Sequence, residues 1–374
     1  MITPRLEIDL DKIYHNATTL VGRLKRLGIS VTGITKAFRG APKIAQMLQR
    51  AGVSGLGDSR IENIERMRRA GIDGQMMLVR SPMISQVDRV VAAADISFNT
   101  ELDVIAALSR AAQKTRTWHG VVLMVELGDL REGIMPRDVA KAVQTVRRFP
   151  HIRLKGLGSN LACRNGVSPD NANMEMLSAL ADQTDEHIEN SGFIVSGGNS
   201  SNLSWAFGGG KVRRVNNLRL GEAILCGCEP LHGRHIPGLY RDAITLVAEV
   251  IESKIKPTKP WGTLGQAPFG QVPVTIDDGN IFQSLLAIGR QDIDPDGLQP
   301  LSGVTVLGAS SDHLVLNTGS CQLVLGAEVS FQPDYSALLR AMTSPYVTQT
   351  FTGNVVAAVP HPGPFIAPCF SGAA

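Results

Sequence analysis

Between about residues 12 and 235, short apolar runs alternate with stretches of helical periodicity, and this alternation restricts the fold more than any other feature of the chain. Several runs, such as Val121–Val125, are continuously apolar, as strands buried on both faces are. Eight strands separated by helices is the number of a (β/α)8 barrel, whereas an open doubly wound sheet usually contains fewer. The predicted strands are Ser30–Thr35, Val53–Gly57, Met76–Arg80, Ala94–Phe98, Gly120–Leu127, Arg153–Ser159, Phe193–Gly197 and Asn217–Leu220. The predicted helices include Pro42–Ala51, Ile61–Ala70, Leu102–Gln113, Pro136–Phe149 and Met174–Asn190.

The pattern changes after residue 236, where Val, Thr, Gly and Pro become frequent and alternating runs replace the helices. Such runs are typical of an antiparallel β domain, and they include Ala243–Ile251, Gly303–Leu307 and Leu314–Asn317. The first ten residues alternate in the same way, so we expect them to pair with this second domain. The tail after Tyr346 is rich in proline and has no core pattern, which predicts an extended or poorly ordered segment.

The predicted fold class is therefore α/β, a TIM-like (β/α)8 barrel with a C-terminal, mostly antiparallel β domain. A chain of 374 residues is long enough for both. We expect the barrel over residues 11–235, the β domain over residues 1–10 and 236–346, and the tail over residues 347–374.

Charge and cysteine content exclude several classes of partner. The formal net charge of +3 is small for this length, and the basic stretch at residues 66–69 lies beside glutamates at helical spacing, so no nucleic-acid partner is expected. No run approaches the roughly 20 apolar residues of a membrane span, and the N-terminus lacks the apolar region of a signal peptide. Five scattered cysteines favour a reducing cytoplasm, with a trimmed periplasmic precursor as the alternative.

Barrel enzymes carry their chemistry at the carboxyl ends of the strands. The first predicted strand runs into Lys36, and a lysine desolvated on one side by a buried strand is suited to form a Schiff base. On spacing alone, a lysine that reaches from the barrel rim to solvent remains the simpler interpretation. The seventh predicted strand runs into a Gly-Gly turn within residues 195–201, and the eighth ends in a second glycine turn at Gly221. Such turns bind anions through backbone N–H groups. Together these features favour a cofactor with a carbonyl and a phosphate, and pyridoxal 5′-phosphate (PLP) fits that description.

The chain resembles the fold-type III PLP enzymes, the family of alanine racemase. Residues 7–17 look like the entry segment that leads to this family's cofactor lysine. Five further segments are similar to the ornithine-racemase branch: 124–133, 195–201, 217–222, 287–292 and 307–314. The resemblance covers residues 4–346 and implies a PLP-dependent racemase that interconverts L- and D-amino acids by removing the Cα proton. It implies ornithine, or another basic amino acid such as lysine, as the substrate.

Carried over by position, the resemblance implies that Lys36 binds PLP and moves the Cα proton on one face of the substrate. Arg131 would lie near the cofactor's phenolate oxygen and the substrate carboxylate, and Arg219 would face the pyridine nitrogen. The phosphate would be held by Ser200, by the backbone of Gly221 and Glu222, and by Tyr335. The resemblance also implies a head-to-tail homodimer, in which the second domain of a partner subunit completes the active site.

The chain departs from alanine racemase at three positions. Asn160 stands where that enzyme has a histidine against the pyridine ring, and Arg290 stands where it has a tyrosine near the substrate carboxylate. Trp261 aligns near the family's second catalytic tyrosine and cannot transfer a proton. The second acid/base group is therefore an open question for the sequence.

The expected replacements for that tyrosine are His313 and Asp312, with Cys163 as a weaker candidate. A purely structural role of His313 is an equally open interpretation. The residues expected to contact the substrate are Arg131, Arg290, Asp292 and Ser311. The carboxylate of Asp292 or Asp312 would suit the side chain of a basic amino acid.

Two other functions remain as alternatives. Residues 310–313 are faintly similar to a segment that holds a metal ligand in D-threonine aldolase and D-serine dehydratase, which are PLP lyases of the same fold. Those enzymes need a second ligand in a His-x-Cys or His-x-Asp pair, which does not follow His313, so no metal site is expected. The third interpretation is a non-catalytic PLP-carrier protein, although such proteins lack a second domain.

Overall fold

The computed structural model describes residues 2–185, 192–265 and 277–353 of the chain. Its larger part is a closed barrel of eight parallel strands, which confirms the predicted (β/α)8 architecture. The barrel closes where β9 pairs with β2, with Ser30 opposite Asn217. The strands are β2 (Ser30–Ile34), β3 (Gly55–Asp58), β4 (Met76–Leu78), β5 (Ile96–Asn99), β6 (His119–Met124), β7 (Ile152–Gly158), β8 (Ile194–Ser196) and β9 (Asn217–Leu220).

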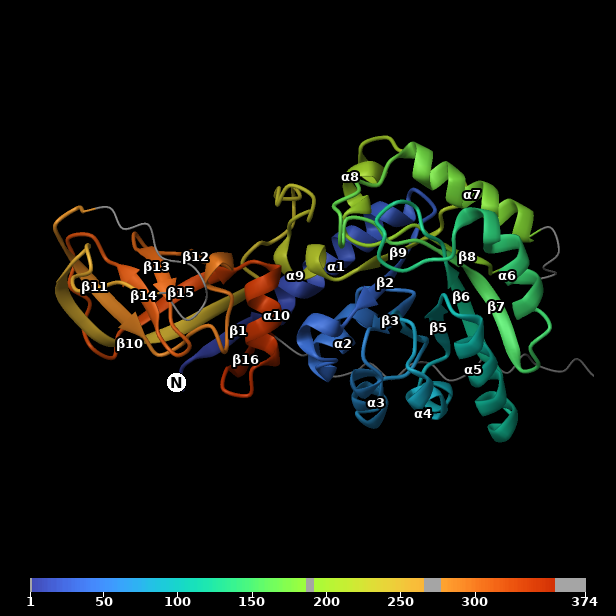
Figure 1. The fold of residues 1–374 in the computed structure, drawn as a ribbon, viewed down its shortest axis with the longest axis horizontal. Helices are drawn as coiled ribbons and strands as arrows, with labels where there is room; N and C mark the ends of the chain where they lie inside the picture. The colour runs from blue at the N-terminus through green and yellow to red at the C-terminus, as the bar shows by residue number, and fades with distance from the viewer. Residues whose placement is uncertain (1, 186–191, 266–276, 354–374) are drawn as a thin grey trace, which may run out of the picture.

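Helices surround the barrel on the outside (Figure 1). They are α1 (Leu10–Lys25), α2 (Pro42–Arg50), α3 (Ile61–Arg69), α4 (Val87–Ala93), α5 (Leu102–Thr115), α6 (Val139–Val146), α7 (Asn171–Asp185), α8 (Asn202–Phe207) and α9 (Glu222–Cys226). Short 3₁₀ turns are η1 (Lys36–Phe38), η2 (Ile84–Gln86) and η3 (Pro136–Asp138).

Two of the predicted helices differ from the observed ones by three residues or more at an end. The helix predicted from Met174 begins at Asn171, because Asp170 and Asn173 exchange hydrogen bonds between side chain and backbone and cap its first turn. The predicted end of that helix, at residues 186–190, lies outside the described residues. The helix predicted over Pro136–Phe149 opens as the 3₁₀ turn η3 and ends at Val146.

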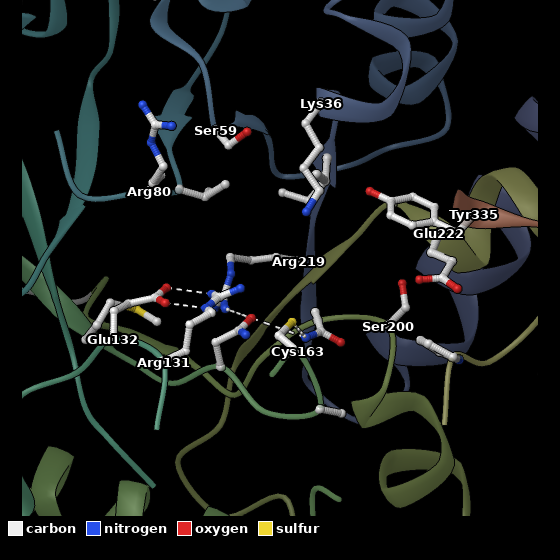
Figure 2. Close-up of a pocket in the computed structure, with 18 of the residues that line it drawn as sticks. Lys36, Ser59, Arg80, Arg131, Glu132, Cys163, Ser200, Arg219, Glu222 and Tyr335 are labelled. Atoms are coloured by element: carbon white, nitrogen blue, oxygen red, sulfur yellow. Dashed lines mark hydrogen bonds and ion pairs between the residues drawn. The ribbon is translucent and has the colours of Figure 1, made fainter. Parts of the chain in front are cut away.

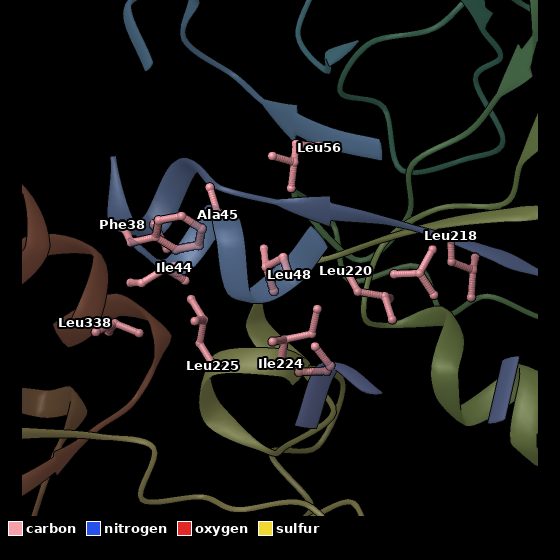
Figure 3. Packing of buried hydrophobic residues seen from close by; sticks show 14 of the residues in the cluster. Phe38, Ile44, Ala45, Leu48, Leu56, Leu218, Leu220, Ile224, Leu225 and Leu338 are labelled. Carbon is pink, nitrogen blue, oxygen red and sulfur yellow. The ribbon is translucent and has the colours of Figure 1, made fainter. Parts of the chain in front are cut away.

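Two apolar cores stabilise the barrel. A small cluster that includes Met77, Phe98 and Val122 fills its interior. A larger cluster packs helices against its outer face, and Figure 3 shows Ile44 and Leu48 of α2 among leucines of β3, β9 and α9. Most strand residues are therefore buried on both faces of the barrel wall, which explains the continuously apolar sequence of a strand such as β6.

The second domain is an antiparallel sheet with the order β12-β15-β10-β11-β14-β13. Its strands are β10 (Ile244–Pro257), β11 (Asn280–Leu286), β12 (Leu298–Pro300), β13 (Thr305–Ala309), β14 (Leu314–Asn317) and β15 (Glu328–Pro333). The short turn η4 (Pro295–Gly297) and the helix α10 (Tyr335–Thr343) belong to the same region of the chain. The structure thus confirms a mostly antiparallel β domain after the barrel.

The N-terminal strand β1 (Arg5–Asp9) joins this sheet, as its alternation predicts, and pairs antiparallel with β10. The predicted tail differs from expectation at its start, where β16 (Thr348–Thr352) pairs in parallel with β1. Residues 348–352 therefore belong to the sheet, and the boundary expected at residue 347 is too early. The register of β16 depends on β1, more than 330 residues earlier, so no local pattern marks this strand. Residues 354–374 lie outside the described part.

The helix α10 connects the second domain to the barrel. It packs against η1, directly after the first barrel strand, and Figure 3 shows Leu338 of α10 near Phe38 of η1. This contact places Tyr335, the first residue of α10, at the mouth of the barrel. None of the helices in the described ranges is long and apolar enough to cross a membrane.

Candidate active site

A cavity of about 430 Å³ opens at the carboxyl ends of the barrel strands, a volume typical of small-molecule sites. Figure 2 shows Lys36 pointing into it, Ser200, Glu222 and Tyr335 gathered at one end, and Arg131 away from that end. The structure brings together in its wall all eight residues that the sequence predicted for cofactor binding: Lys36, Arg131, Asn160, Ser200, Arg219, Gly221, Glu222 and Tyr335.

The position of Lys36 is fixed by the end of β2. The preceding Thr35 donates its hydroxyl hydrogen to the buried carboxyl group of Asp58 at 2.6 Å, which ties β2 to the end of β3. Asp58 also accepts hydrogen bonds from Asn63 and from the backbone of Arg60. Burial raises the pKa of Asp58, and these hydrogen bonds act against that shift. The amine of Lys36 lies 5.9 Å from the centre of the Tyr335 ring.

Arg219 is buried at the end of β9 and is held by three acceptors. Its Nη1 donates to the hydroxyl oxygen of Ser196 at 2.6 Å, and its Nη2 donates to the carbonyl of Ser159 at 2.7 Å and to the amide oxygen of Asn160 at 3.2 Å. The guanidinium carbon lies 5.1 Å from the centre of the Phe98 ring. Burial lowers the pKa of Arg219 to about 10, so the side chain remains a cation at neutral pH.

Asn160 shows an unsatisfied donor in the cavity wall. Its amide oxygen accepts from Arg219 and from Asn199, so the Nδ2 group faces away from both. This Nδ2 is buried and has no hydrogen-bond partner among the described residues. A buried donor without a partner is costly unless a ligand satisfies it.

The loop after β6 places Arg131 in the cavity. The guanidinium forms a two-pronged ion pair with Glu132, with Nη2 to Oε1 at 2.5 Å. Burial lowers the pKa of Arg131, but the pairing with Glu132 outweighs it and the pKa is raised. Leu130, just before Arg131, has a φ of 52°, and Ala162, just before Cys163, has a φ of 56°. Left-handed backbone at non-glycine residues is uncommon and collects at functional sites.

The opposite end of the cavity presents groups that bind anions. The hydroxyl oxygen of Ser200 accepts the backbone N–H of Ala223 at 3.2 Å, which joins the loops after β8 and β9. At Gly221 an added Cβ would lie 3.1 Å from the Cβ of Ile34, so the backbone approaches β2 closely there. Burial raises the pKa of Tyr335 above its ordinary value, so its hydroxyl stays protonated and can donate.

The donor set fits PLP. The amine of Lys36 suits the cofactor's aldehyde, and the hydroxyl groups of Ser200 and Tyr335 beside the turn at Gly221 suit its phosphate. The fixed guanidinium of Arg219 suits the ring nitrogen. The unpartnered Nδ2 of Asn160 offers a further donor in the same wall.

The second-domain residues predicted for the substrate do not line this cavity. Arg290 and Asp292 lie in the loop after β11, where Asp292 accepts the hydroxyl hydrogen of Ser344 at 2.5 Å. The backbone N–H of Arg290 donates to the carbonyl of Ser310 at 2.9 Å, which joins this loop to the turn between β13 and β14.

The predicted proton-transfer residues lie in that same turn. Asp312 accepts hydrogen bonds from Gln291 at 2.5 Å and from the hydroxyl of Ser311 at 2.7 Å. The Nδ1 of His313 is 3.4 Å from the hydroxyl of Ser310. The loop after β11 and the β13–β14 turn thus form one cluster on the second domain, apart from the cavity of the same chain. Trp261 is 83% exposed, also outside the cavity.

Several cavity residues were missed by the sequence analysis, although one signal could have found them. Ser59, Arg80 and Ser81 lie within three residues of the carboxyl ends of β3 and β4, much as Lys36 lies after β2. Glu132 follows Arg131 and was not singled out. The side chain of Arg80 forms no hydrogen bond or ion pair with any residue in the described ranges.

Comparison with known proteins agrees with this geometry. Residues 8–229 match the protein family described as "Alanine racemase, N-terminal domain". The chain is 35% identical to the ornithine racemase of Acetoanaerobium sticklandii over 348 residues, which is 92% of this chain and 98% of the relative. It is 37% identical to the lysine racemase of Thermotoga maritima over 361 residues, 95% of this chain and 100% of the relative.

Solved structures share the fold. The alanine racemase of Streptomyces lavendulae superposes with a TM-score of 0.73 at 18% identity, over 95% of this chain and 99% of that one. A D-threonine aldolase from Filomicrobium marinum superposes with a TM-score of 0.70 at 17% identity, over 91% and 89%. The alanine racemase of Bartonella henselae, solved with covalently bound pyridoxal phosphate, has a TM-score of 0.70 at 16% identity and covers 94% of this chain and all of that one. The chain belongs to the alanine racemase family.

Proposed function

We propose that this protein is a PLP-dependent racemase of basic amino acids, with ornithine or lysine as the substrate. The observation that carries the proposal is the placement of Lys36, Arg219 and the Ser200–Tyr335 hydroxyl pair in one cavity at the barrel mouth. Identities of 35% and 37% to an ornithine racemase and a lysine racemase over nearly the whole chain support the reaction and the substrate class.

When bound, PLP stabilises the negative charge that remains on the substrate Cα after its proton leaves. Lys36 would hold the cofactor's aldehyde carbon and exchange the Cα proton on its own side of the cavity. Ser200, Tyr335 and the backbone of Gly221 would hold the phosphate. Arg219, fixed by three acceptors, would face the ring nitrogen.

Two other cavity residues would orient the bound groups. Asn160, whose Nδ2 lacks a partner among the described residues, would lie against the ring. Arg131 would sit near the phenolate oxygen and the substrate carboxylate, with Glu132 fixing its orientation.

Racemisation requires a proton-transfer group on each face of Cα, and Lys36 occupies one face. We propose that His313, with Asp312, serves the other face. Both lie outside the cavity of their own chain, so they would act in the site of a partner subunit. This arrangement requires a homodimer with composite sites, in which Arg290, Asp292 and Ser311 would reach the substrate from the partner.

The test of the proposed function is the Lys36→Ala variant. It should lose both the absorbance of bound PLP and the interconversion of L- and D-ornithine, measured by chiral chromatography. The wild type should incorporate solvent deuterium at Cα of both enantiomers in deuterium oxide. Retained colour that borohydride fixes to a different lysine would refute the assignment of Lys36.

We also propose a cytoplasmic location. The four cysteines within the described ranges are all free thiols, including the exposed Cys163 and Cys321. Free exposed thiols are typical of a reducing compartment.

A further inference from the structure

We propose that the side chain of Glu222 binds the cofactor as a neutral carboxylic acid that donates a hydrogen bond to the phosphate of PLP. PLP affinity should therefore fall as the pH rises above neutrality. The inference rests on the proposed function and goes beyond it, because the side chain of Glu222 has no role there.

The side chain of Glu222 lies at the end of the cavity that would take the phosphate. Glu222 is the first residue of α9, directly after Gly221, and it lines the cavity together with Ser200 and Tyr335. Figure 2 shows its carboxyl group between these two side chains, with the Ser200 hydroxyl close by. The Glu222 carboxyl forms no hydrogen bond or ion pair with any residue that the structure describes, so it is available to a ligand.

Acidic groups face Glu222 from several elements. Asp334 precedes α10 and caps it by accepting the N–H of Ala337, and Glu229 accepts the N–H of Leu231 in the loop after α9. Both carboxylates are therefore held as acceptors.

Glu222 also lines a second cavity of about 400 Å³, which shares Glu222, Pro230 and Tyr335 with the first. The titratable or charged groups in this second cavity are Glu222, Cys226, Cys228, Glu229, Arg241, Asp296, Asp334 and Tyr335. On the side of the active-site cavity, the charge of Lys36 acts on Glu222. The other charged side chains that line this cavity are Arg80, Arg131, Glu132 and Arg219.

This environment favours the protonated form of Glu222. Burial, with the charges of Asp334 and Glu229, raises the pKa of Glu222 to about 7, although Lys36 acts in the opposite direction. A phosphate dianion at the same place adds like charge and disfavours ionisation further. An ionised Glu222 would repel the phosphate, whereas a carboxylic acid donates a short, strong O–H···O⁻ hydrogen bond.

The sign of the pH dependence follows from proton linkage. Below about pH 7, Glu222 already carries its proton and can donate to the phosphate directly. At higher pH a proton must be taken up when PLP binds, so the affinity falls by at most about tenfold per pH unit.

The test measures the dissociation constant of PLP, by equilibrium dialysis of the full-length protein, between about pH 6 and about pH 9. Wild type is compared with Glu222→Gln, whose amide donates a hydrogen bond but cannot ionise. The phosphate and Lys36 titrate in both proteins, so the ratio of the two dissociation constants isolates the part of the pH dependence that requires the Glu222 carboxyl group. We expect the ratio of the wild-type to the variant dissociation constant to rise by up to about tenfold per pH unit above neutrality.

A second variant, Glu222→Ala, and a second ligand, pyridoxal, serve as controls. Glu222→Ala also cannot ionise, so the ratio of the wild-type dissociation constant to that of Glu222→Ala should rise with pH in the same way. At acidic pH, Glu222→Ala should bind PLP more weakly than Glu222→Gln, because alanine cannot donate a hydrogen bond. Pyridoxal, which lacks the phosphate, should show no such difference between wild type and variants. A pH-independent ratio, or an equal effect with pyridoxal, would overturn the role of Glu222. Wild type that binds no PLP at any pH would instead overturn the proposed function, and this inference with it.

Discussion

The buried carboxylate of Asp129 accepts a hydrogen bond from the backbone N–H of Cys163 at 3.1 Å, and so joins the loop after β6 to the loop after β7. The same carboxylate accepts the backbone N–H groups of Arg164 at 2.9 Å and Asn165 at 3.1 Å. These two loops carry Arg131 and Asn160 into the cavity. Asp129 is therefore a positioning residue that fixes one wall of the site.

Asp129→Asn should destabilise the protein by about 2 kcal/mol, because an amide cannot accept from all of these donors. Although burial raises the pKa of Asp129, the backbone donors outweigh it and the folded-state pKa is lowered. The carboxylate's contribution is therefore complete above the unfolded pKa of about 3.9 and is lost as the pH falls through the folded value. Urea unfolding at several pH values should show the difference between wild type and variant shrinking below about pH 4. A difference that is constant with pH would contradict this role.

Gly133→Ala should distort the loop that carries Arg131. An added Cβ at Gly133 would lie 2.3 Å from the backbone nitrogen of Glu126, a contact that only a backbone shift can relieve. We expect a stability loss of about 1–3 kcal/mol and a rise in KM for the amino acid. The matched control is Gly22→Ala in α1, where an added Cβ meets nothing within 4 Å, and which should stabilise by up to about 1 kcal/mol. Equal effects at the two positions would argue against the close approach.

Arg219→Glu should lower the rate of racemisation by at least about tenfold and raise transamination. A carboxylate stabilises a protonated ring nitrogen, which makes the ring a stronger electron sink. Racemisation is measured by chiral chromatography and transamination by the keto acid formed, with far-UV circular dichroism to verify folding. Arg219→Lys keeps the charge but loses the planar fork, and should show the smaller effect. Unchanged racemisation without keto acid in Arg219→Glu would mean that Arg219 does not face the ring nitrogen.

If each active site contains residues of two subunits, two inactive variants should restore activity to each other in mixed dimers. Lys36→Ala removes the barrel group and His313→Ala removes the second-domain group, so each homodimer lacks one of them in both sites. Mixed dimers contain one intact site, and an equimolar mixture refolded together should recover about a quarter of the wild-type activity. Racemisation assays before and after subunit exchange measure this recovery. No recovery despite mixed dimers, or full activity of His313→Ala alone, would show that His313 does not act across the interface.

Racemase activity should survive exhaustive treatment with a chelator. The described residues contain no group of three or more His, Cys, Asp or Glu side chains that could hold a metal ion. The activity of dialysed enzyme with EDTA is compared with that of enzyme given zinc or manganese. Loss of activity with EDTA, its recovery with metal, and glycine or pyruvate among the products would identify a lyase instead.

The sequence by itself determined the barrel and the part of the site that directly follows barrel strands. Eight predicted strands alternate with helical stretches, and several of them are continuously apolar because a barrel strand is buried on both faces, a property visible in its own sequence. Lys36 and the turn at Gly221 were also visible, because a residue that follows a parallel strand lies at the mouth of the barrel whatever the rest of the chain does.

Only the tertiary structure decided how distant loops meet. Asp129 accepts hydrogen bonds from the backbone of residues 163–167, and acidic side chains from other segments surround Glu222. The strand β16 pairs in parallel with β1. These contacts join segments that are up to hundreds of residues apart in the sequence. The separation of His313 from the cavity of its own chain is of the same kind. Such contacts depend on how strands and domains are placed in space, whereas the periodicity of a sequence reports only which face of its own element is buried.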